Sequence, residues 1–108
     1  MTLRGFFRKP SRLKPLLLRQ IVGSSMLPKL RDGRVLVASG WFGRLRPHDL
    51  VIISHEGREK IKRIRHIDNQ KLYVVGDNQA ASTDSRDFGW LPLEAVSAKV
   101  IWPRIGQS

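Results

Sequence analysis

Serine hydroxyls and one lysine are the side chains of this sequence that could do nucleophilic chemistry. A serine hydroxyl is a poor nucleophile and must lose its proton to a neighbouring base during attack. The segment 23–28, Gly-Ser-Ser-Met-Leu-Pro, would project a hydroxyl from a small-residue turn, although such a segment alone is usually only a turn. The three histidines, His48, His55 and His66, stand in no recognisable Ser/His/Asp setting. Lys62 is the alternative base.

Lys62 can act as a base only when it is uncharged. An ordinary lysine, with a pKa near 10.4, is protonated at pH 7, whereas catalytic lysines reach a pKa of about 7 or 8. Lowering the pKa this far costs roughly 3–5 kcal/mol, which only burial supplies. On a strand, Lys62 shares a face with Ile64, while Arg63 and Arg65 point the other way. The mechanism therefore requires residues 59–67 to form a strand.

Short β-branched runs follow residue 34 and are separated by turn signals. The run 59–67 is ambiguous, because its isoleucines recur every three residues, but the turn signals on both sides favour a hairpin. No helix of 10 or more residues and no repeat stands out. We therefore expect a small, mainly β domain, antiparallel or mixed, with little helix and with its chemistry on loops. The expected strands are 34–39, 49–54, 59–67, 72–75 and 96–102.

Length and composition allow one domain and restrict its chemistry. A chain of 108 residues has the usual size of a single domain, and the absence of cysteine excludes disulfides, cysteine zinc sites and thiol catalysis. The net charge of +11 suggests an acidic partner. Residues 1–34, however, hold nine basic side chains and one acidic one, so that +8 of the charge lies there. A nucleic-acid-binding face along the whole chain is therefore disfavoured.

Several short motifs occur together in a characteristic order. Gly-x-Ser-Met-x-Pro begins at Gly23, Arg-Pro-x-Asp at Arg46, Ile-Lys-Arg-Ile at Ile61, Gly-Asp-Asn at Gly76, and Ser-x-Asp-Ser-Arg-x-Phe-Gly at Ser82. This order, over residues 22–103, resembles the type I signal peptidase family of Ser/Lys proteases. Within that family, the compact length, the missing membrane anchor and the run 76–89 are most similar to the nickel-type superoxide dismutase maturation proteases.

The resemblance implies roles for individual residues. Ser25 corresponds to the nucleophile and Lys62 to the general base. Ser82 corresponds to the serine that orients the lysine amine, and Asp84 and Arg86 to a pair that buttresses the site. Alternate spacing in an extended segment would place these last three on one face. Five further residues are expected to serve the oxyanion hole or to shape the adjacent turn: Gly23, Ser24, Gly76, Asp77 and Asn78.

The sequence also departs from the family. Many members carry a serine at the position of Gly23, and its hydroxyl helps to hold the oxyanion. Here the oxyanion hole would rest on the Ser25 backbone N–H, with Ser24 or another backbone amide as the second donor. Losing one donor costs about 2.7–4 kcal/mol of transition-state stabilisation. His48 stands where the family usually has glycine, which we interpret as local turn variation.

We interpret residues 1–21 as a basic amino-terminal arm and residues 22–108 as the catalytic domain. The longest uncharged stretch of the arm, residues 15–18, is too short for a membrane span or a signal-peptide core. The arm would either contact a membrane surface or a partner weakly, or pack as an extension on the domain edge. We expect a cytoplasmic protein, at most peripheral to the membrane.

The leading hypothesis is a serine endopeptidase that removes an amino-terminal propeptide from a precursor protein, which the resemblance suggests is nickel superoxide dismutase. No metal or cofactor is expected on this chain, because the histidines lack metal-ligand spacing, and any nickel would belong to the substrate. One alternative is a general signal peptidase acting on exported preproteins. Another is a basic nucleic-acid-binding module, which is weakened because aromatic residues are not interleaved with the basic ones. Trp90 and Trp102 are expected to be packing residues.

Overall fold

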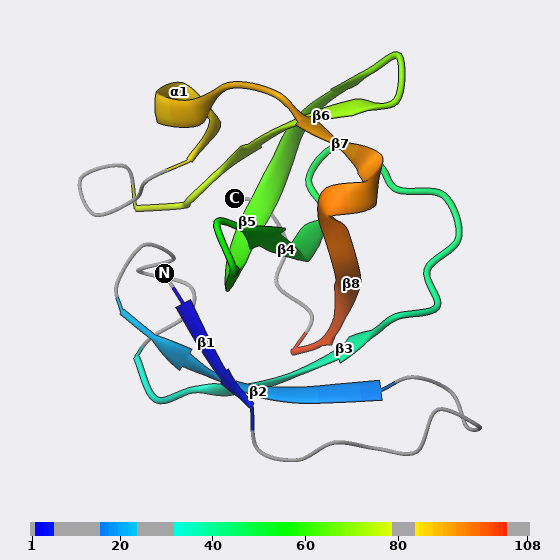
Figure 1. Cartoon of the computed structure of the whole chain (residues 1–108). Helices are drawn as coiled ribbons and strands as arrows, with labels where there is room; N and C mark the ends of the chain where they lie inside the picture. The colour runs from blue at the N-terminus through cyan, green and yellow to red at the C-terminus, as the bar shows by residue number, and fades with distance from the viewer. Residues whose placement is uncertain (1, 6–15, 24–31, 79–83, 104–108) are drawn as a thin grey trace.

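One antiparallel sheet dominates the computed structural model, which describes residues 2–5, 16–23, 32–78 and 84–103 (Figure 1). Eight strands are hydrogen-bonded in the order β1-β2-β3-β8-β4-β5-β6-β7. The expectation of a mainly β domain with little helix is confirmed. In chain order the elements are β1 (Thr2–Gly5), β2 (Leu16–Val22), β3 (Val35–Ser39), β4 (Leu50–His55), β5 (Arg58–Asp68), β6 (Lys71–Val75), α1 (Ser85–Phe88), β7 (Leu91–Pro92), the 3-10 helix η2 (Leu93–Ala95) and β8 (Val96–Trp102).

The expected strands and hairpins are confirmed to within a residue or two. β4 pairs with β5, and β5 pairs with β6, each across a tight turn. Both turns carry two successive residues with positive φ, Glu56-Gly57 and Asn69-Gln70. Two such residues are what a type I′ turn needs, and its twist matches that of the flanking strands.

The isoleucine spacing of β5 results from burial on both faces of the strand together with a bulge. Ile61 packs into one apolar cluster and Ile64 into another. The register with β6 shifts between Ile64 and His66. Because a bulge adds one residue to the strand, Ile67 returns to the face of Ile64 and packs against the same cluster. A period of three, which usually indicates a helix, here describes a two-sided bulged strand.

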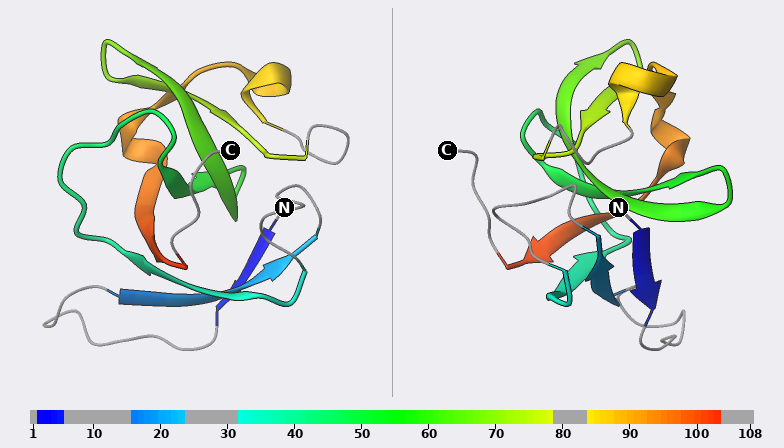
Figure 2. Two further views of the ribbon diagram at one scale, coloured as in Figure 1. Left: turned by 180° about the vertical axis from the view of Figure 1, so that it is seen from behind. Right: turned by 90° about the vertical axis from the view of Figure 1, so that its left-hand side faces the viewer.

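Two strands that the sequence did not predict lie in the amino-terminal third. β2 pairs with β1 on one side and with β3 on the other. β1 also pairs with β5, where Thr2 lies opposite Lys60. This contact closes six strands into a ring, in the order β1, β2, β3, β8, β4 and β5. Both views of Figure 2 show β1 beside β2. The division into an arm and a catalytic domain at residue 22 stays a prediction, but parts of the arm are strands of this sheet.

Two apolar clusters hold the sheet together. They lie on opposite sides of β4 and β5, since successive residues of a strand point to opposite faces. The first contains Ile21, Leu36, Ala38, Leu50, Ile52, Ile61 and Ala98. The second contains Val51, Ile53, Ile64, Leu72, Val74, Leu91 and Val96.

The turn that precedes β4 has a strained residue. His48 has a φ of 79°, in the left-handed region that favours glycine. Its N–H donates to the Ile64 carbonyl at 2.7 Å, and its own carbonyl accepts from Arg63. These bonds hold the backbone in this conformation, which glycine adopts without strain. This is a physical reason for the glycine that is usual at this position in the family that the sequence resembles.

Candidate active site

Lys62 lies in the interior of the described structure. It is on β5 opposite Val51, and its side chain has no exposed surface. Burial lowers the pKa of Lys62 from 10.5 to about 8, with Lys60 and Arg86 also lowering it and Asp84 opposing them. At pH 7 roughly a tenth of such a lysine is neutral, compared with less than about one part in a thousand for an ordinary one. Lys62 therefore points inward, as expected, and is neutral far more often than an ordinary lysine.

Asp84 binds both the backbone directly after β6 and the side chain of Arg86. It is fully buried, and its carboxylate accepts hydrogen bonds from the Gly76 N–H at 2.8 Å and from the Arg86 N–H at 3.0 Å. The Arg86 guanidinium donates to the same carboxylate through Nε, at 2.9 Å, and through Nη2. The hydrogen bond that Arg86 donates to Asp84 raises the pKa of Arg86, which stays charged. The expected Asp84–Arg86 pair is formed, although its role at the site remains a prediction.

The expected geometry of this pair is wrong in one respect. The sequence predicted an extended segment that places alternate residues on one face. Instead, Asp84 is the N-cap of helix α1, and Asp87 completes a capping box by accepting from the Asp84 N–H. Arg86 reaches Asp84 because the chain turns, not because it alternates. The spacing of Asp84 and Asp87, an acidic residue three positions after a capping one, is the sequence signal that could have predicted the helix start.

Ser85 is a buried polar residue that the sequence analysis missed. Its hydroxyl accepts the Val74 N–H at 2.9 Å, and its side chain is almost completely buried. β7 pairs with β6 only at Lys71 and Leu72, so the Val74 N–H lies beyond that ladder. Ser85 satisfies a backbone donor that would otherwise be buried without a partner.

A second buried ion pair lies at the other side of Gly76. Arg63, directly after Lys62, donates through Nε and Nη2 to the two carboxylate oxygens of Asp77, each at 2.9 Å. It also donates to the His48 carbonyl at 2.9 Å. The expected turn residue Asp77 thus pairs with the strand that carries Lys62. No spacing of residues in the sequence indicates this contact, because Arg63 and Asp77 belong to different elements.

Gly23 directly follows β2 and begins the segment that is expected to hold the nucleophile. The Gly23 N–H donates to Asp32 Oδ1 at 2.9 Å, so the two ends of the intervening segment are held together. Val22 and Lys60 both pair with Thr2 on β1, which places them roughly 10 Å apart at one strand spacing each. Gly23 has a φ of 105°, a conformation that glycine adopts far more readily than the serine found there in many members of the resembling family.

The expected site residues divide into two groups. Ser24, Ser25 and Ser82 lie outside the described residues. Gly76, Asp77 and Asn78 directly follow β6. Asp84, the N-cap of α1, is hydrogen-bonded to Gly76, and Arg86 lies in α1. Gly23 directly follows β2. The described part of the chain holds no cluster of three His, Asp or Glu side chains that could bind a metal.

The tryptophans lie at the surface. Trp90 and Trp102, expected to be packing residues, do contact other side chains but are 44% and 52% exposed, so neither is part of the core. Trp102 is the last residue of β8. The Arg34 guanidinium carbon lies over the Trp102 ring, 5.5 Å from the ring centroid. Trp41 is 68% exposed, whereas its neighbour Phe42 packs against the second apolar cluster.

The fold and the site define a class of protein, a small antiparallel β domain with a buried lysine whose pKa is lowered. Residues 59–104 match the family model described as signal peptidase, peptidase S26. The matched stretch includes Lys62, Asp84 and Arg86 and leaves out the turn that begins at Gly23. It supports a signal peptidase-like family, which suggests serine peptidase activity. None of the curated proteins matches the chain. Among the described residues, no helix is both long enough and apolar enough to cross a membrane.

Proposed function

We propose that the chain is a serine endopeptidase in which Ser25 is the nucleophile and Lys62 the general base. The observation that carries the proposal is the burial of Lys62, which lowers its pKa to about 8. A neutral amine accepts the hydroxyl proton as the serine attacks the scissile carbonyl, and the resulting ammonium then protonates the leaving amine. An ordinary surface lysine could not perform the first of these steps at pH 7.

The sheet register supports the pairing of these two residues. Ser25 is three residues after Val22, whose neighbour across β1 is Lys60. Lys60 and Lys62 share a face of β5, because the bulge lies further along. Three residues span up to about 10 Å, so Ser25 can reach the region of the Lys62 amine.

The surrounding charges adjust the pKa of the proposed base, Lys62. Asp84 raises the pKa of Lys62 and thus stabilises the ammonium that forms after proton transfer, while Arg86 occupies the same carboxylate and moderates the effect. Ser82, two residues before Asp84, is proposed to orient the amine. The second oxyanion donor is proposed to be Ser24 or a backbone amide of the same turn.

The proposed substrate is a precursor protein from which an amino-terminal propeptide is removed. The run 76–89 supports the nickel superoxide dismutase precursor, as it is most similar to the corresponding maturation proteases. A general signal peptidase acting on exported preproteins is the second candidate, and it is favoured by the exposed Trp41 and Trp102, which could touch a membrane surface.

Incubation with the purified precursor, followed by sequencing of the product's amino terminus, tests the proposal. Ser25→Ala and Lys62→Ala should each abolish cleavage while circular dichroism shows an intact fold. Ser54→Ala and Lys71→Ala, matched changes at exposed strand positions, should cleave at the wild-type rate. A folded Lys62→Ala variant with the wild-type rate would refute the dyad, and an intact precursor would refute the substrate.

A further inference from the structure

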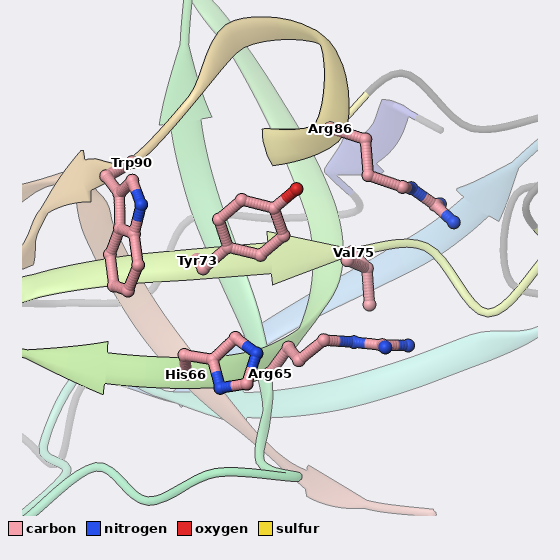
Figure 3. A pocket seen from close by; sticks show the side chains of 6 residues that line it. All are labelled: Arg65, His66, Tyr73, Val75, Arg86 and Trp90. Carbon is pink, nitrogen blue, oxygen red and sulfur yellow. The ribbon is translucent and has the colours of Figure 1, made fainter.

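A pocket of about 450 Å³ opens on the outer face of the β5–β6 hairpin, next to α1. It is separate from the buried side of β5, where Lys62 and Ile64 lie. Figure 3 shows its lining side chains, which come from β5, from β6, from α1 and from the segment between α1 and β7. They are Arg65, His66, Tyr73, Val75, Arg86 and Trp90.

One end of the pocket is aromatic. The rings of Tyr73 and Trp90 meet edge to face with centroids 5.5 Å apart, and His66 lies 6.0 Å from Tyr73. These contacts hold the rings in place, since aromatic pairs favour such arrangements. Trp90 is nevertheless 44% exposed. The pocket therefore offers a preformed apolar wall, and the aromatic residues that looked scattered in the sequence lie beside arginines in the fold.

The other end of the pocket is cationic. The Arg65 and Arg86 side chains flank Val75, and in Figure 3 both guanidinium groups extend in the same direction. None of the described residues that line the pocket is acidic. Arg65 is exposed and makes no hydrogen bond or ion pair within the described part of the chain. The bulge in β5 falls at this residue, and bulges commonly re-aim a side chain.

We propose that this pocket binds an acidic side chain of a polypeptide, with an adjoining apolar residue against the aromatic wall. A guanidinium binds a carboxylate through two parallel hydrogen bonds, and Arg65 is available for such a pair. If the proposed peptidase function holds, the bound polypeptide is the substrate, and the pocket selects precursors with an acidic residue near the cleaved bond. Arg86 joins the pocket to the candidate site, because it also binds Asp84, which acts electrostatically on Lys62.

Binding of a short fluorescent peptide that carries adjacent Asp and Leu residues tests the proposal without any need for cleavage. The counterpart with Asn in place of Asp should bind at least about tenfold more weakly. Arg65→Glu should weaken binding of the acidic peptide by about tenfold or more and leave the Asn peptide unaffected. Trp90→Ala should weaken binding of both peptides. Thermal unfolding of each variant verifies that it is folded, and Arg65→Gln, which conserves size, should show a smaller loss than Arg65→Glu.

Arg58→Glu is the matched control, because Arg58 is an exposed arginine at the other end of β5. It should change the affinity for the acidic peptide by less than about twofold. Equal losses for Arg58→Glu and Arg65→Glu would show attraction to the net positive charge and overturn the proposal. A short single-stranded oligonucleotide that binds more tightly than the acidic peptide and depends on Arg65 would overturn it in favour of nucleic acid.

The two proposals can fail separately. Binding that depends on Arg65, in a protein that cleaves neither peptide nor precursor, would support the pocket and refute the peptidase. Cleavage at equal rates of precursors with and without the acidic residue would support the peptidase and refute the pocket as a selector. Lys62→Ala should bind the acidic peptide as the wild type does, since Lys62 does not line the pocket.

Discussion

The buried Lys62 costs stability at the pH where the proposed enzyme works. Its pKa is about 8 in the folded protein and 10.5 as an ordinary lysine. Between these two values the unfolded chain binds more protons than the folded one, so stability rises with pH through this window. Below about pH 8 both states are protonated and the cost of burying the charge is fully present.

Lys62→Met should therefore raise the free energy of unfolding at pH 7, by about 1–3 kcal/mol, because an apolar side chain of similar length replaces a buried ammonium. Urea unfolding at pH 7 and at pH 10 measures the effect, and the gain should shrink at the higher pH. Lys71→Met, at an exposed position, should change stability little at either pH. A Lys62→Met protein that is less stable than the wild type at pH 7 would contradict the reasoning.

The pH dependence of cleavage should also report Lys62. The neutral amine is the active form, so kcat/KM should rise about tenfold per pH unit below pH 8 and level off above it. Asp84 raises the pKa of Lys62, so Asp84→Asn should move the midpoint of this rise to lower pH. The same change should cost about 1–3 kcal/mol of stability, since it removes the carboxylate that pairs with the partly exposed Arg86.

A series of cleavage assays between pH 6 and pH 10 measures the shift. Asp68→Asn, at the exposed last residue of β5, is the control and should leave the midpoint unchanged. A midpoint that moves upward in Asp84→Asn would mean that Lys62 is not the titrating base.

The sequence predicted the site better through single side chains than through pairs. Lys62 could be identified because strand alternation and the apolar neighbour Ile64 make its inward orientation a local property of the sequence. The Arg63–Asp77 pair could not be identified, because it depends on how β5 meets the turn after β6. The same holds for Ser85, which gains its role only when the segment after Asp84 folds back onto β6.

Among the elements, α1 depends on a hydrogen bond to β6. Ser85→Ala leaves the Val74 N–H buried without its acceptor, which should cost about 1–3 kcal/mol of stability. Thermal or urea unfolding measures the loss. Ser97→Ala, at an exposed position of β8, should change stability by less than about 0.5 kcal/mol. Equal effects of the two substitutions would show that the Val74 N–H finds another partner.

Strand prediction succeeded where β-branched runs lie between turn signals and failed where composition concealed the strand. β3, β4, β5, β6 and β8 are bounded by glycine, proline or asparagine turns and have β-branched residues. β2 also has Pro15 before it and Gly23 after it, but its run of leucines with Arg19 resembles part of a basic arm. It is a strand because β1 and β3 satisfy its backbone on both sides, which no local pattern reveals.

At the scale of the whole molecule, some basic side chains of the amino-terminal third make contacts with later strands. Arg19 on β2 donates to both carboxylate oxygens of Glu59 on β5, at 2.7 and 3.2 Å, and Arg34 lies over Trp102. These contacts tie the amino-terminal strands to the strands that follow them. The positive charge of residues 1–34 is thus a component of the closed sheet as well as a feature that could attract an acidic partner.

β1 is the strand that joins the two halves of the proposed site, because the described pairings place it between β2, where the serine turn begins, and β5, which carries Lys62. Deletion of residues 1–5 should open the ring at this point, lower the melting temperature and abolish cleavage, although every motif residue remains. The deletion also removes one positive charge, so Arg4→Ala, which keeps the backbone pairing, is the matched control and should cleave normally. Differential scanning calorimetry and the precursor assay measure both properties. Full cleavage by the shortened chain would show that the serine and the lysine are brought together without β1, and that the Arg19–Glu59 contact suffices to hold β2 near β5.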